Sequence, residues 1–163
     1  MGAAKIRTVP LVEKYQIVHH SYVDIMGLLK SLPSWFSQMN YDFTEKGLAE
    51  KDLGTGYQVD SEWAASRKVT EYVKYEIDIS ISAKDLRKIV LESGEETYWA
   101  RVVIGLEVRF VKDYQNKYKN YGMEEFMRQF YEKYLVKDDL RKLMGKCMGE
   151  FGDLTGTIKS YLK

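Results

Sequence analysis

The stretch Tyr72-Val-Lys-Tyr-Glu-Ile-Asp-Ile-Ser-Ile-Ser82 decides the fold of this chain. Its apolar members, which alternate strictly with charged or hydroxyl side chains, are Val73, Tyr75, Ile77, Ile79 and Ile81. Such period-two alternation is typical of an antiparallel strand with one face packed against the protein and the other in solvent. The cover for the packed face must come from elsewhere in the chain. The segment after Gly122, which carries apolar residues at helical spacing, is the candidate.

Other segments also have strand patterns, separated by turn signals. Ser93-Gly-Glu-Glu96 is typical of a hairpin turn between two of them. The strand after this turn is long, and we expect it to bend at Gly105. The charged stretch 44–52 is not assigned to a strand. The strands that we expect are residues 13–20, 57–68, 71–82, 86–92 and 97–112.

Helical patterns occur near both ends of the chain. Ser21 and Asp24 fit a capping box ahead of apolar residues at helical spacing, and Pro33 should end or kink that helix. Apolar residues mark a second helical face over 123–134, and the register resumes over 140–161. We expect a kink near Lys137, with Asp138 capping the second segment.

These elements predict one α+β domain over residues 1–163. It is a curved antiparallel sheet that grips the long C-terminal helix, with the first helix closing one end. The chain is long enough to bury a sizeable core, and 45% hydrophobic with 30% charged residues is ordinary for a soluble globular protein.

The charge and cysteine content exclude several classes of function. The formal net charge is +1, so nucleic-acid binding has no global positive field to draw on. Cys147 is the only cysteine, which excludes an intramolecular disulfide and favours a cytoplasmic setting. No stretch is apolar enough to span a membrane. His19 and His20, the only histidines, point to opposite faces of a strand, so we expect no metal site and no cofactor.

A cavity between sheet and helix is one hypothesis for function. The chain has many methionines, which suit an adaptable apolar cavity, and three tryptophans, which line ligand pockets as readily as they fill cores. The side chains that would line such a space are Trp63, Trp99, Met127, Phe130 and Met144.

Four glycines in the C-terminal segment form a second candidate. Their spacing of 4, 3 and 4 places them on one side of a helix, away from its apolar stripe. One interpretation is a smooth groove for another helix, a second subunit or a ligand. The other is a broken helix, because glycine often terminates helices. The four are Gly145, Gly149, Gly152 and Gly156.

The loop from Lys112 to Tyr121 is the third candidate. Tyr114, Lys117 and Lys119 belong to a run of aromatic and basic residues that could stack on and neutralise single-stranded nucleic acid. The simpler interpretation is a solvated connection whose tyrosines pack on the next helix. We therefore treat RNA or a ribonucleoprotein as an unfavoured partner.

The chain resembles an uncharacterised family of archaeal proteins. The stretches that carry the resemblance are Trp63, 68–78 (KVTEYVKYEID), 113–118 (DYQNKY), 130–134 (FYEKY) and 158–162 (IKSYL). The order of elements also looks like the helix-grip arrangement of START/Bet v1-type (SRPBCC) domains. That resemblance implies an apolar ligand between sheet and helix, and it transfers no catalytic residue.

We therefore expect a non-enzymatic binding module for an apolar small molecule or lipid. No nucleophile elbow, phosphate-binding glycine loop or HExxH motif points to catalysis. The alternative is an interaction module that forms homo-oligomers through the glycines or docks on a ribonucleoprotein through the Lys112–Tyr121 loop.

Overall fold

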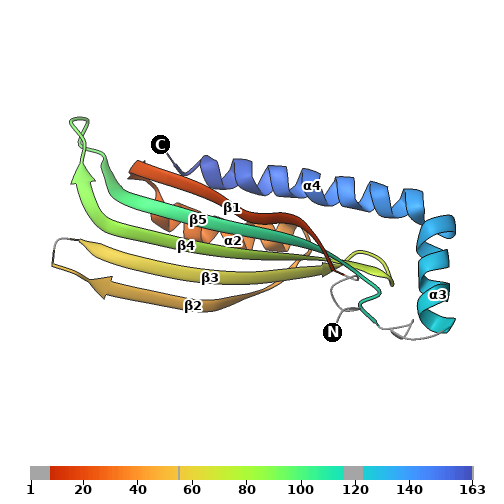
Figure 1. Cartoon of the computed structure of the whole chain (residues 1–163). Helices are drawn as coiled ribbons and strands as arrows, with labels where there is room; N and C mark the ends of the chain where they lie inside the picture. The colour runs from red at the N-terminus through yellow and green to blue at the C-terminus, as the bar shows by residue number, and fades with distance from the viewer. Residues whose placement is uncertain (1–7, 55, 116–122, 163) are drawn as a thin grey trace.

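The fold is built on a five-stranded antiparallel sheet (Figure 1), seen in a computed structural model that describes residues 8–54, 56–115 and 123–162. The strand order is β1-β5-β4-β3-β2, and every neighbouring pair is antiparallel. The sheet does not close into a barrel, because β1 and β2 remain its two edges. The strands are β1 (Thr8–Val23), β2 (Asp42–Asp52), β3 (Tyr57–Lys68), β4 (Val73–Val90) and β5 (Glu96–Lys112).

One face of the sheet forms the core, which confirms the alternation seen in the sequence. In β4, Tyr75, Ile77 and Ile81 are fully buried, whereas Glu76 and Asp78 on the opposite face are partly exposed. The neighbouring strand β5 continues the buried face. We call this the inner face of the sheet, and the opposite one its outer face.

Two helices cover the inner face. They are α2 (Ile25–Gln38) and α4 (Lys137–Lys159), and α4 runs along the length of the sheet (Figure 1). The C-terminal helix therefore lies on the apolar side of the sheet, as the sequence predicts. Its side chains in the core are Leu140, Cys147, Leu154 and Ile158.

The strand assignments differ from the expectation in two places. The two strands expected over 71–82 and 86–92 are one strand, β4 (Val73–Val90), whose register shifts between Lys84 and Arg87 around the positive φ of Asp85. The charged stretch 44–52 lies in β2, which sequence analysis missed. All of β2 is exposed at the edge of the sheet, although Phe43 near its start stacks on Phe36 of α2, so most of its side chains need not alternate.

The bend at Gly105 stays a prediction, and the structure shows another role for this glycine. The ladder of β5 continues without a register shift through Gly105, which pairs with Gln16 and Ser80. A Cβ at this position would lie 2.7 Å from Ser80 Oγ. The glycine therefore permits a close approach between two central strands.

Helix α2 starts and ends later than expected. Ser21 still belongs to β1, and Asp24 is the N-cap, whose carboxylate accepts a hydrogen bond from Gly27 N at 3.0 Å. The helix passes through Pro33 and ends at Gln38. Proline removes one helical hydrogen bond, and the burial of Trp35 and Phe36 just beyond it offsets that loss.

The kink expected near Lys137 is confirmed. Helix α3 (Met123–Phe130) continues into a single π-helical turn, η1 (Tyr131–Leu135), and the direction changes at Val136 before α4 begins. As a result, α3 turns sharply away from the axis of α4 (Figure 1). Asp138 is not the cap: it lies in the first turn of α4, where a negative charge complements the helix dipole.

Candidate functional site

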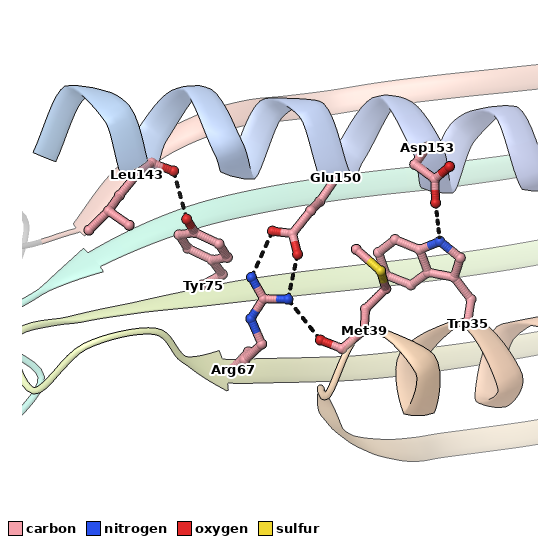
Figure 2. A network of polar contacts seen from close by, with 7 residues as sticks. All are labelled: Trp35, Met39, Arg67, Tyr75, Leu143, Glu150 and Asp153. Atoms are coloured by element: carbon pink, nitrogen blue, oxygen red, sulfur yellow. Dashed lines mark hydrogen bonds and ion pairs between the residues drawn. The ribbon is translucent and has the colours of Figure 1, made fainter. Parts of the chain in front are cut away.

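An ion pair lies beneath α4, between the helix and the inner face of the sheet (Figure 2). Arg67 of β3 donates from Nη2 to Glu150 Oε2 at 2.9 Å and from Nη1 to the carbonyl oxygen of Met39 at 2.7 Å. The Glu150 side chain is 7% exposed and that of Arg67 15%. A charge pair buried to this extent is retained only where hydrogen bonds satisfy it, and here it joins three segments of the fold.

Aromatic rings enclose this ion pair. The Arg67 guanidinium lies 4.9 Å from the centre of the Tyr41 ring and 5.2 Å from that of Tyr75. The Tyr75 hydroxyl donates to the carbonyl oxygen of Leu143 at 2.7 Å. Burial, with the nearby Cys147 and Glu150, raises the pKa of Tyr75 to about 12. Burial and Glu150 also raise the pKa of Tyr41, whose hydroxyl has no hydrogen-bond partner among the described residues.

Cys147 lies in the same network, and its thiol is unreactive. Cys147 is fully buried, and burial followed by the charge of Glu150 raises the pKa of its thiol to about 12. A protonated, inaccessible thiol is neither a nucleophile nor a metal ligand. Nearby, the indole of Trp35 donates to Asp153 Oδ2 at 2.8 Å. The network therefore attaches α4 to the sheet and to α2, and its chemistry does not indicate catalysis.

The five residues predicted to line one cavity lie apart. Trp63 is buried on the inner face beside Phe43. Trp99 is on the outer face, where it contacts His20 and lies under the Arg87 guanidinium at 4.5 Å.

The remaining three predicted residues lie near the junction of α3 and α4. Met127 and Phe130 are exposed on α3, and Met144 is partly buried on α4. The inner face between Trp63 and this junction is occupied by buried side chains such as Tyr75 and Phe110.

A groove of about 440 Å³ is present where η1, α4 and the end of β5 meet. We call it the corner groove. Leu140 and Met144 give it an apolar part. Three of its cations, on Lys133, Lys137 and Arg141, form no ion pair with any residue of the described ranges. Its lining residues are Lys112, Gln129, Glu132, Lys133, Lys137, Leu140, Arg141 and Met144.

Among the described residues that line the corner groove, Glu132 is the one carboxylate, and it is already neutralised. Glu132 Oε2 lies 3.1 Å from Lys112 Nζ and 3.2 Å from Arg128 Nη1, and Oε1 accepts a hydrogen bond from the Tyr72 hydroxyl. Burial and this bond raise the pKa of Tyr72. With Glu132 satisfied inside the fold, the groove keeps an excess of positive charge.

Helix α3 and the turn η1 are oriented with their apolar side outward. The Arg128 side chain packs against the protein and is only 1% exposed, whereas Phe126 and Tyr134 are each 64% exposed. An amphipathic helix on a globular protein normally has the opposite arrangement. We call the outward side the apolar face, and it consists of Phe126, Met127, Phe130 and Tyr134.

The four glycines all lie within α4, which continues without interruption to Lys159. The interpretation as a broken helix is therefore wrong. A Cβ added to any of the four would meet nothing within 4 Å, so the glycines form a smooth strip that faces open space. The glycines of this strip are Gly145, Gly149, Gly152 and Gly156.

Only part of the Lys112–Tyr121 loop can be placed. Lys117 and Lys119 lie outside the described residues. The Tyr114 hydroxyl donates to the carbonyl oxygen of Thr70 at 2.7 Å, and Lys112 binds Glu132. These two side chains are thus occupied in contacts within the fold.

The outer face of the sheet carries a ladder of charges. Arg109 Nη1 lies 2.7 Å from Asp78 and 3.5 Å from Glu107, and Arg109 Nε lies 3.6 Å from Glu76. Opposite charges on neighbouring strands compensate each other here, as expected for a solvated sheet surface.

Sequence analysis missed Arg67, Glu150 and Arg128. Glu150 gives one recognisable signal, since it falls within the apolar stripe of α4 at helical spacing from Cys147 and Leu154. A charge in that position predicts a buried partner. Arg67 carries no comparable signal, because its partner is set by tertiary packing. Arg128 and Glu132 are four residues apart, a spacing that indicates a helical ion pair but not its burial.

Comparison with known proteins gives no assignment: no family model matches the chain, and no curated protein matches it. Among the described residues, no group of three or more acidic, histidine or cysteine side chains could hold a metal ion. Within the same ranges, no helix is long and apolar enough to cross a bilayer.

Proposed function

We propose that this protein is a non-enzymatic binding module for an apolar small molecule or lipid that carries an acidic group. The ligand site is the corner groove, next to the apolar face. The observation that carries the proposal is the composition of the corner groove, where the apolar side chains of Leu140 and Met144 lie beside cations that form no ion pair within the described ranges.

The chemistry of the corner groove matches this class of ligand. Its volume of about 440 Å³ lies within the range of small-molecule sites. Leu140 and Met144 offer contacts to an alkyl chain, and the unpaired cations on Lys137 and Arg141 offer contacts to a carboxylate or phosphate. The site thus differs from the space under α4 that the sequence suggested.

We also propose that the fold is an open relative of the helix-grip arrangement. The order of elements and the position of α4 across the inner face support this kinship. The sheet is not closed around the helix as in a complete helix-grip fold. We therefore place the ligand outside the space beneath α4.

The test is a titration with a long-chain fatty acid below its micelle concentration, followed by native mass spectrometry and by fluorescence. The corresponding alcohol, which lacks the charge, serves as the ligand control. We expect the acid to bind in a complex of one ligand per chain and more tightly than the alcohol.

The variant Arg141→Gln should weaken binding of the acid, whereas Lys51→Gln on the exposed strand β2 should not. Equal binding of acid and alcohol, or no binding of either, would contradict the proposal.

A second candidate function is self-assembly through the glycine strip. Four glycines inside one helix destabilise it by about 0.8–1.0 kcal/mol each relative to alanine, and no neighbour within the described chain requires them. Light scattering tests this alternative. A monomer at all concentrations, unchanged by Gly149→Leu, would eliminate it.

A further inference from the structure

We infer that the apolar face of α3 and η1 docks on the surface of an anionic lipid bilayer. This inference rests on the proposed function, since it names the source from which a lipid ligand would reach the corner groove. It concerns a different set of side chains from those that hold the ligand.

The apolar face has the composition of a helix that lies in a membrane interface. Interfacial helices place large apolar side chains, phenylalanine among them, on one side and polar residues on the other. Here Phe126, Met127 and Phe130 point away from the protein, and Arg128 points into it. The polar side of the helix is therefore satisfied by the protein, which holds the apolar side outward.

Positive charge lies along one edge of this face, on the side of the corner groove. The Lys133 ammonium lies 5.4 Å from the centre of the Tyr134 ring, at the edge of the apolar face. Lys133, Lys137 and Arg141 also line the corner groove and form no ion pair within the described ranges. Glu132, the acidic group of the groove, is bound by two cations and a tyrosine hydroxyl. The surface is thus complementary to anionic headgroups.

The small area of the apolar face disfavours a second copy of the chain as its binding partner. The four side chains expose roughly 400–500 Å² in total, at about 200 Å² for a fully exposed aromatic side chain. A stable interface buries about 800 Å² on each partner. A bilayer requires neither a matched area nor a matched shape.

The experiment is co-sedimentation of the full chain with vesicles of phosphatidylcholine alone and with vesicles containing a third of phosphatidylglycerol. We expect binding to the anionic vesicles, little binding to the neutral ones, and loss of binding at high salt. Lys133→Gln should weaken anionic binding about fivefold, the usual effect of one basic residue near such a surface.

Two matched variants separate docking from ligand binding. Phe126→Ser with Phe130→Ser should abolish sedimentation with vesicles yet leave binding of the monomeric fatty acid intact, because neither residue lines the corner groove. Leu48→Ser removes an equally exposed apolar side chain from β2 and should change nothing. Circular dichroism establishes that each variant folds.

Three results would overturn the inference. They are equal binding to neutral and anionic vesicles, no binding to either, and a concentration-dependent dimer that Phe130→Ser disperses. If vesicle binding fails while the fatty acid still binds, the docking inference alone is lost. If the fatty acid fails while the vesicles bind, the proposed ligand site is lost and the docking surface remains.

Discussion

Replacing Arg67 by methionine tests whether the ion pair under α4 is as buried as its surroundings indicate. The substitution keeps a long apolar side chain between Tyr41 and Tyr75, so packing is largely preserved. It removes the only charge that faces Glu150 in the described network and the donor to the Met39 carbonyl oxygen. The carboxylate then stays beneath the helix without compensation.

The expected effect follows from the low exposure of both groups. Removing one partner of a buried ion pair destabilises proteins by about 3–5 kcal/mol, because the remaining charge loses its solvation without gaining a partner. Domains of this kind have a total unfolding free energy of roughly 5–15 kcal/mol. Arg67→Met should therefore remove a large share of the stability. Replacing Glu150 by methionine as well should restore most of it.

The assay is urea unfolding followed by far-UV circular dichroism, with the m-value checked for constancy. Arg109→Met is the matched control, since Arg109 also pairs with a carboxylate at 2.7 Å but lies on the solvated outer face. An exposed pair contributes about 1 kcal/mol or less. If the Arg67 and Arg109 variants lose similar stability, or if the double variant does not recover, the assignment of a buried pair is refuted.

Three further outcomes are expected. Gly149→Ala should raise the unfolding free energy by about 0.8–1.0 kcal/mol, because the helix is continuous there and the added methyl meets open space; a loss of stability would show that the strip has a close neighbour. Asp24→Ala should lower it by about 1 kcal/mol through loss of the N-cap, while Ser21→Ala should have little effect; the reverse order would restore Ser21 as the cap. The melting temperature should fall as pH rises above 9. In the unfolded chain Cys147 and Tyr75 release their protons with pKa values of 9.0 and 10.0, whereas in the native protein both groups stay protonated, so each lowers the unfolding free energy by about 1.4 kcal/mol per pH unit until about pH 12. A melting temperature that stays constant to pH 11 would contradict these pKa assignments.

The sheet was largely predictable because one of its faces is packed. The residues from Val73 to Ile81 alternate because every second side chain enters the core. The same pattern predicts the ends of β3 and β5 to within one residue of those in the structure. The edge strand β2 could not be found in this way. Both its faces are wet, so nothing constrains Leu48 or Ala49 to alternate with polar residues.

The candidate site was predictable only in part. The periodicity of Phe126 and Phe130 identified a helix, and the natural assumption was that their side faces the sheet. A helical pattern shows which residues form the apolar side of the helix, but not whether that side faces the sheet or the solvent. Here the direction is set by Glu132, which pairs with Arg128 in the same segment and contacts Tyr72 just before β4 and Lys112 at the end of β5. Tyr72 and Lys112 are distant in sequence and carry no local signal.

The position of α4 after all five strands has a consequence for synthesis of the protein. The sheet can begin to assemble on α2 once β5 has emerged, but α4, the second helix that covers its inner face, is made last. At about 5–20 residues per second, the stretch from Lys112 to Lys159 takes several seconds to translate. During that interval the part of the inner face that α4 covers is exposed, and the nascent chain should be a substrate for chaperones that bind apolar strands.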